Sequence, residues 1–194
     1  SGSVLLGKHP FNANQEFEGT MDDIHLYNRV LSTTEIDSLY HINGWQTMAD
    51  IDGNEYATVT IGNQTWMAEN LKVTKYRNGD AIPKITDNTS WSNLSTGAYS
   101  NYDNTDSNAD TYGSLYNWYA LNDSRMVAPE GWHIPSDEEV IQLETFLGMN
   151  QASAEQTYWR GTDESGKLKE VGTIHWDSPN TGATNSSGFT MLPG

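Results

Sequence analysis

The chain of 194 residues carries 10 Lys and Arg against 26 Asp and Glu, a formal net charge of −16, and it has no cysteine. A surface this acidic repels phosphate backbones and anionic membranes, and the missing cysteine excludes disulfides, thiolate nucleophiles and cysteine-based zinc sites. Seven Trp and ten Tyr, in a chain with a mean hydropathy of −0.66, predict a folded, loop-rich domain and not a disordered one. The composition favours an exported bacterial protein, extracellular or at the cell surface.

The first part of the chain, residues 1–44, contains one predicted strand and one predicted helix. Residues 16–27 alternate apolar and polar positions imperfectly, with a period of two. Ser32 and Glu35 have the spacing of a capping box, and the apolar helix face that follows ends at Asn43 and Gly44. We place a domain boundary between residues 44 and 45.

The second part begins with hairpin signals. Asp50–Asn54 resembles the start of a calcium-binding EF-hand, but its Gly lies at the wrong position and no Glu follows at the twelfth, so we predict a turn. Residues 56–61 alternate as one strand, and residues 64–71 form a second strand after the turn at Gly62 and Asn63.

Beyond this hairpin we predict a long polar loop over residues 86–112, followed by an aromatic run over residues 115–121 that is buried on one side. Ser136 and Glu139 repeat the capping-box spacing and predict a helix that ends at Gly148. Its buried stripe consists of Val140, Leu143, Phe146 and Leu147. The remaining residues predict loops and short strands.

Residues 1–44 resemble the end of a laminin-G-like, concanavalin-A-type jelly roll. The matching residues are Leu5–Gly7, Phe17–Ser32, Glu35–Ile36 and Leu39–Tyr40. The resemblance covers only the last strand of that sandwich and the helix after it. It implies that residues 1–44 are the C-terminal piece of such a domain.

Residues 45–194 resemble the Fibrobacter succinogenes major paralogous domain, a C-type-lectin-like module of bacterial surface proteins. The blocks that carry this resemblance are Ile61–Leu71, Tyr112–Ala120, Pro129–Asp137, Trp159–Asp163, Lys167–Glu170 and Gly182–Gly194. It implies an α+β fold, rich in strands and loops, with short helices. Ala128 stands where the family often has Cys, and the sequence stops before the family's C-terminal strands. We therefore expect a fragment, or a domain that another chain completes.

The sequence does not indicate an enzyme. The lectin-like fold is shared with the formylglycine-generating enzymes, but those depend on active-site cysteines that this chain lacks. The five histidines are widely spaced, and no Gly-x-Ser-x-Gly motif is present. Glu16 and Glu18 alternate as glycosidase carboxylates do, yet we assign them a solvated role. His133 is assigned to the core or to a turn. We predict a non-catalytic protein.

One acidic loop has the composition of a calcium site. Calcium binds six to eight oxygens from carboxylates, amides and carbonyls. Residues 101–110 contain six Asn or Asp, and the candidate ligands are Asp103, Asn104, Asp106, Asn108 and Asp110. The alternative is a surface loop rich in Asx turns, which needs no metal.

Carbohydrate binding is the activity that the resemblance favours, with a glycan or a surface protein as the partner. Such a site needs exposed aromatic rings beside polar groups. Trp91 and Trp159 lie in polar segments and are the candidate ligand-binding residues, whereas Trp118 and Trp132 are assigned to the core and Trp66 to a half-buried strand position. The alternative function is a structural spacer or a subunit of a surface appendage or phage-like fibre.

Overall fold

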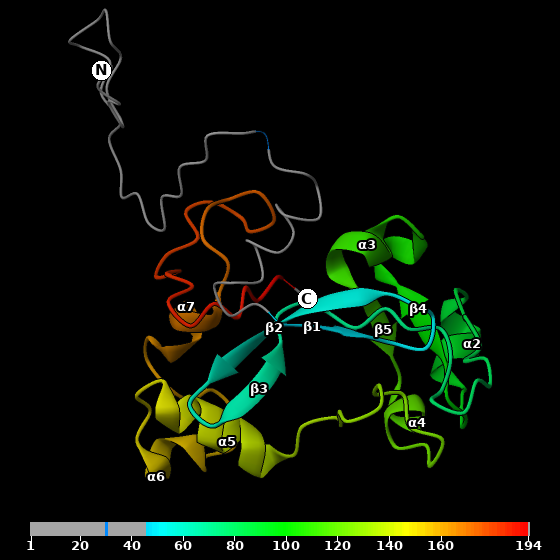
Figure 1. The fold of residues 1–194 in the computed structure, drawn as a ribbon, viewed down its shortest axis with the longest axis horizontal. Helices are drawn as coiled ribbons and strands as arrows, with labels where there is room; N and C mark the ends of the chain where they lie inside the picture. Colours follow the sequence, from blue (N-terminus) through cyan, green and yellow to red (C-terminus); the bar gives the residue numbers. More distant parts are fainter. Residues whose placement is uncertain (1–29, 31–45, 194) are drawn as a thin grey trace, which may run out of the picture. The chain divides into compact units, whose positions relative to one another are not determined.

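The computed structural model describes residue 30 and residues 46–193 (Figure 1). The described helices and strands all lie in one unit of the chain, Tyr40–Gly194. The strand and helix predicted within residues 1–44, the jelly-roll resemblance, and residues Glu16 and Glu18 fall outside the described residues. The boundary between residues 44 and 45 stays a prediction.

A three-stranded antiparallel sheet begins the described fold. It consists of β1 (Gln46–Ala49), β2 (Glu55–Ile61) and β3 (Gln64–Met67) in the order β1-β2-β3. The predicted strand over residues 56–61 is confirmed, while the second strand ends at Met67 and not at residue 71. After Met67 the chain bends at Ala68 and Glu69, although Ala68 N still donates to Ala57 O of β2 (2.8 Å).

The turn between β1 and β2 is built around one buried carboxylate, as predicted for Asp50–Asn54. Asp50 Oδ1 accepts from the N–H groups of Asp52 (2.9 Å) and Asn54 (3.0 Å). Its Oδ2 accepts from Asn54 Nδ2 (2.9 Å) and from the buried Tyr56 hydroxyl (2.6 Å). Burial, followed by the bond to Asp50, raises the pKa of Tyr56 well above its usual range. The carboxylate therefore organises a turn and leaves no oxygen for a metal.

The second sheet is a pair of three-residue strands, β4 (Tyr99–Asn101) and β5 (Ser114–Tyr116), which are antiparallel. Around them lie α2 (Asn88–Ser92), the 3-10 helix η1 (Tyr102–Asn104), α3 (Asn108–Tyr112) and α4 (Trp118–Leu121). The predicted long loop over residues 86–112 is thus wrong: it contains two short helices, a 3-10 turn and a strand.

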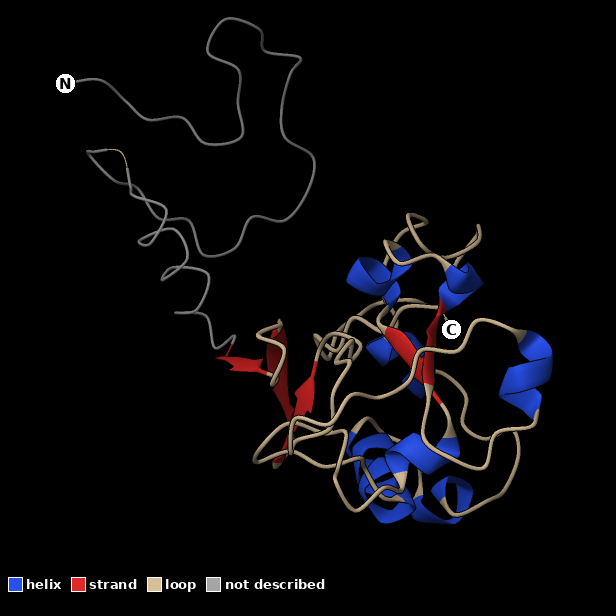
Figure 2. Ribbon diagram, turned by 90° about the vertical axis from the view of Figure 1, so that its right-hand side faces the viewer, coloured by secondary structure: helices blue, strands red, loops and turns tan. Residues whose placement is uncertain are grey.

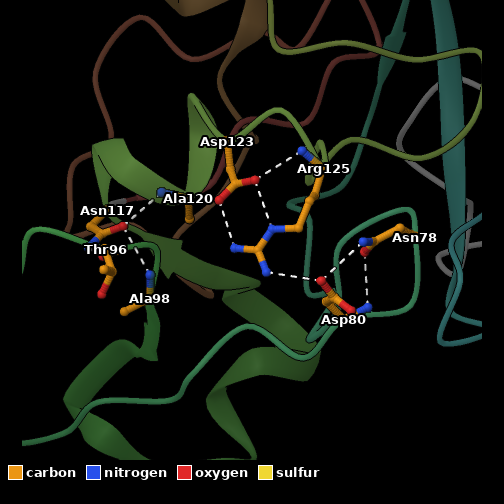
Figure 3. A network of polar contacts seen from close by, with 8 residues as sticks. All are labelled: Asn78, Asp80, Thr96, Ala98, Asn117, Ala120, Asp123 and Arg125. Carbon is orange, nitrogen blue, oxygen red and sulfur yellow. Dashed lines mark hydrogen bonds and ion pairs between the residues drawn. The ribbon is translucent and has the colours of Figure 1, made fainter.

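The aromatic run over residues 115–121 is less buried than predicted. It divides into β5 and α4, with Asn117 between them, and Ala120 is the residue of α4 that is fully buried. Trp118 is 68% exposed, so its assignment to the core is wrong. The side chain of Asn117 caps α4 by accepting from Ala120 N (2.9 Å), and it also accepts from Ala98 N (3.0 Å) (Figure 3).

The predicted capping box is confirmed. Helix α5 (Asp137–Phe146) starts after Ser136, whose hydroxyl accepts from Glu139 N (3.3 Å), while the Glu139 carboxylate accepts from Ser136 N (2.8 Å). Leu143 and Leu147 are buried as predicted, but Phe146 is 64% exposed. Two further helices follow, α6 (Gln151–Ala154) and α7 (Glu164–Leu168).

Two apolar clusters hold these elements together. One contains Val73, Tyr76, Ile82, Ala120 and Val127, under the two-stranded sheet. The other contains Ile61, Leu143, Leu147 and Leu168, between the three-stranded sheet, α5 and α7. Figure 2 shows the two sheets as separate small elements joined by long loops and short helices. The fold is a loop-rich α+β arrangement with small antiparallel sheets, and the described residues form no β-sandwich.

One polar network ties the loops beside the first cluster (Figure 3). Arg125 forms ion pairs with Asp123 (2.7 Å) and Asp80 (3.1 Å), and its guanidinium lies 4.0 Å from the centre of the Tyr76 ring. Hydrogen bonds from the side chain and the backbone N–H of Arg125 lower the pKa of Asp123 to about 2. No helix within the described residues is long and apolar enough to cross a membrane.

Candidate binding cleft

A cleft of about 520 Å³ opens between β3, the loop over residues 128–135 and the C-terminal segment. We call it the aromatic cleft, because Trp66, Trp132 and Phe189 line it. The other lining residues are Asn63, Gln64, Thr65, Met67, Leu71, Ala128, Pro129, Gly131, His133, Ile134, Pro135 and Glu139. Its size lies within the range of small-molecule sites, which combine apolar walls with a few polar groups.

Trp66 reaches the cleft from β3. Its position opposite Val59 in the sheet register places the ring beside Phe189, with ring centres 6.0 Å apart and planes inclined by 57°. Half-burial of Trp66 agrees with the prediction. Its indole N–H, however, is buried and has no hydrogen-bond partner among the residues that the structure describes. Because buried donors are normally paired, this N–H is an exception among the described residues.

Arg77 holds the opposite wall in place. Its Nη2 donates to three backbone carbonyls, those of Ala128 (2.9 Å), Pro129 (2.8 Å) and Trp132 (2.9 Å), and Nε donates to Ala128 (3.1 Å). A guanidinium is planar and rich in donors, so one side chain can bind several carbonyls at once. Arg77 therefore positions Trp132, which is half-buried in the cleft wall and not in the core as predicted.

A row of amides forms one rim of the aromatic cleft. Gln64 Nε2 donates to the backbone oxygen of Glu139 (3.0 Å) and to Gln142 Oε1 (3.1 Å), and Gln142 Nε2 donates to Asn63 Oδ1 (2.9 Å). These bonds tie the β2–β3 turn to α5. They use the donors of Gln64 and leave its side-chain oxygen as an acceptor for a ligand.

His133 and Glu139 form a second polar group at the rim. His133 Nε2 lies 2.7 Å from Glu139 Oε1, so His133 is an exposed residue of the loop before α5, with a carboxylate partner, and it lies neither in the core nor in a turn. The Ser136 N–H and then the His133 ring lower the pKa of Glu139 below its usual range. Glu139 is thus an anchor for the histidine and for the start of α5, and His133 Nδ1 remains available to a ligand.

The two predicted aromatic platforms lie elsewhere. Trp91 is half-buried in α2, at a pocket of about 260 Å³ that also contains Asp103 and Asn104. Trp159 is 98% exposed, next to Tyr158, which is 95% exposed. Neither lines the aromatic cleft. Sequence reasoning missed the cleft because Trp66 and Trp132 stand in apolar segments, where the pattern predicts burial.

Four of the five predicted calcium ligands have side-chain contacts with other residues. Asp106 forms an ion pair with Lys84, and Asp110 lies 3.7 Å from Lys72. The Asn104 side chain accepts from Ser100 Oγ (2.8 Å), and Asn108 donates to the Tyr102 carbonyl (3.0 Å). Asp103 and Asn104 both have φ of +53°, which is typical of Asx-rich turns. Within residues 46–193 no group of three or more His, Asp or Glu has a metal-binding arrangement. Calcium stays a prediction from the sequence.

A comparison with known families found one family model that matches most of the chain. The family model described as the Fibrobacter succinogenes major domain matches residues 59–194, which is more than half of the chain and contains every residue of the aromatic cleft. Searches of the curated proteins and of the solved structures found no match.

Proposed function

The chain belongs to the Fibrobacter succinogenes major domain family, and we propose that it is a non-catalytic module that binds carbohydrate in the aromatic cleft. Domains of this family are typical of bacterial surface proteins, and the family is not a known catalytic one. The resemblance is therefore confirmed for residues 59–194. We propose that the protein is exported and that its partner is a glycan or a surface protein.

The observation that carries the proposal is the combination of aromatic walls with unused polar groups. Sugar rings present apolar C–H faces that pack on aromatic rings, and their hydroxyls both donate and accept hydrogen bonds. The cleft offers Trp66, Trp132 and Phe189 for the first kind of contact. It offers the Gln64 side-chain oxygen and a His133 ring nitrogen for the second. A net charge of −16 favours neutral glycans over acidic ones.

A glycan array with three variants tests the proposal. We expect Trp132→Ala to lower the affinity for a bound neutral glycan at least tenfold, because it removes one wall of the cleft. Trp159→Ala is the control, since Trp159 is exposed and lies outside the cleft, and it should bind as the unchanged chain does. If Trp91→Ala or Trp159→Ala abolishes binding while Trp132→Ala does not, the site lies at the platforms predicted from the sequence. Absence of binding to any glycan refutes the proposed function.

A structural role in a surface appendage or fibre is the second candidate. Tyr158 and Trp159 favour it, because two adjacent large rings that are 95% and 98% exposed are typical of a contact with another protein. Ordered assemblies in electron micrographs, lost in the Trp159→Ala variant, would support this role.

Calcium binding at residues 103–110 is a separate proposal that rests on the sequence. A lower melting temperature after EDTA treatment would support it. An unchanged melting temperature would refute it.

A further inference from the structure

The aromatic cleft contains a carboxylate that no lysine or arginine of the cleft neutralises. Among the described residues that line it, Glu139 is the acidic one and none is Lys or Arg. The Glu139 side chain keeps 35% of its accessible surface, so a ligand in the cleft can reach it. The Ser136 N–H and the His133 ring hold the pKa of Glu139 below its usual range, so this carboxylate is charged at neutral pH.

Three polar groups at the rim of the cleft present acceptors. Glu139 Oε1 binds His133 Nε2 (2.7 Å) and Oε2 accepts from Ser136 N (2.8 Å), but a carboxylate has about four lone-pair positions, so two stay unused. In a neutral His133 the proton lies on Nε2, against the carboxylate, which leaves a lone pair on Nδ1. Gln64 donates from its amide nitrogen to α5, so its side-chain oxygen is the third acceptor. The rim therefore suits a ligand group that is rich in donors.

The chain around the cleft is also without basic residues. Residues 46–71, 126–159 and 170–194, which contain all the lining residues, have no Lys or Arg. Arg77 binds the loop that forms one wall, but it is not a lining residue, and its Nε and Nη2 donate to backbone carbonyls. The dipole of α5 brings about half a unit of positive charge to the rim. The first turn of that helix carries three carboxylates, Asp137–Glu139, which outweigh the dipole.

We propose that the aromatic cleft selects sugars that carry a protonated amino group; this rests on the carbohydrate function proposed above. The faces of Trp, Tyr and Phe rings attract cations, and Trp does so most strongly. The cleft has two Trp rings and one Phe ring. An ammonium group has three donors and no acceptor, so it matches the acceptors of the rim as well as the rings. A hydroxyl group at the same position brings one donor and no charge, and an acetylated amine brings no charge either.

Three methyl glycosides test this selectivity, those of glucosamine, glucose and N-acetylglucosamine. The first two differ in one group of similar size, an ammonium against a hydroxyl. An amine with electron-withdrawing neighbours, such as an α-amino group, has a pKa of about 7.7–8.0, so most of it is charged at about pH 7. Affinities are measured by titration of the ¹⁵N-labelled chain, followed on the indole N–H signals of Trp66 and Trp132. We expect the glucosamine glycoside to bind about tenfold more tightly than either neutral one.

Two matched variants locate the charge that selects. Glu139→Gln removes the charge but keeps the start of α5, because Gln also serves in a capping box. We expect it to reduce the tenfold preference to about threefold or less. Glu138→Gln removes the same charge from the same helical turn, but Glu138 is exposed and does not line the cleft, so the preference should stay near tenfold.

Equal affinities of the unchanged chain for the glucosamine and glucose glycosides would overturn the selectivity and leave the carbohydrate function standing. An equal fall of the preference in both variants would also overturn it, because the preference would then come from the overall charge of the chain. If none of the three glycosides shifts the Trp66 or Trp132 signals, the carbohydrate function itself is refuted, and the selectivity with it.

Discussion

Replacement of Arg77 by methionine is the sharpest test of how the aromatic cleft is built. The substitution keeps most of the side-chain volume and removes all donors to the carbonyls of Ala128, Pro129 and Trp132. A hydrogen bond to a charged group contributes about 1.5–3 kcal/mol, and the released carbonyls recover part of this by binding water. We expect the free energy of unfolding to fall by about 2–4 kcal/mol.

Arg125→Met is the matched control, because it removes the same charge. The ion pairs of Arg125 with Asp80 and Asp123 are partly exposed, and the Arg125 side chain retains 39% of its accessible surface. Exposed pairs contribute about 0–1 kcal/mol, so the loss should be clearly smaller. In urea denaturation, with a slope of about 2 kcal/mol per molar, Arg77→Met should lower the midpoint by about 1–2 M.

The same substitution reports on the cleft wall. The Trp132 carbonyl loses its anchor, so we expect the indole N–H signal of Trp132 to broaden in ¹⁵N NMR spectra and glycan affinity to fall about tenfold, through lost pre-organisation. Arg125→Met should leave both unchanged. Equal losses of stability in the two variants would refute the reasoning, and so would a sharp, unshifted Trp132 signal in Arg77→Met.

Three further substitutions test local features of the fold. Ser136→Ala removes the cap of α5 and should cost about 1 kcal/mol in urea denaturation; an unchanged midpoint would contradict the capping argument. Gly62→Ala should destabilise the fold more than Gly53→Ala does. Both positions have positive φ, but an added Cβ at Gly62 would lie 2.8 Å from the Phe146 ring, whereas nothing lies within 4 Å of one at Gly53. Equal melting temperatures of the two variants would contradict this. Asp123 has its pKa lowered to about 2 by Arg125, so its ion pair stabilises the fold above about pH 4 and is lost as the pH falls toward 2. Asp123→Asn should therefore flatten the fall of the melting temperature in that pH window, and an unchanged slope would exclude the pair as a cause.

Features with a local signal were predictable from the sequence. The hairpin turn at Asp50 and the capping box at Ser136 and Glu139 depend on residues within four positions of one another, and both are confirmed. The buried positions Leu143 and Leu147 follow from helical spacing. Helices α2 and α3 were missed, because five residues are too few to show that periodicity in a polar segment.

Features that depend on distant contacts were not predictable. Arg77 binds carbonyls that lie 51 to 55 residues further along the chain. Because every residue has a backbone carbonyl, the sequence does not show which carbonyls will accept these bonds. Trp132 was assigned to the core because its neighbours are apolar, but it is half-buried in the wall of a cleft. Trp118 was also assigned to the core for its apolar neighbours, but it is 68% exposed at the start of α4.

The way in which Arg77 holds its loop has an evolutionary consequence. Every amino acid has a backbone carbonyl, so substitutions at residues 128 to 132 can change the shape and chemistry of the loop while the three acceptors stay in place. Members of one family could thus diversify the ligand they recognise by mutating this loop alone, without rebuilding the scaffold beneath it. In the proposed function, the residues that select a ligand are therefore separate from the residue that holds them in place.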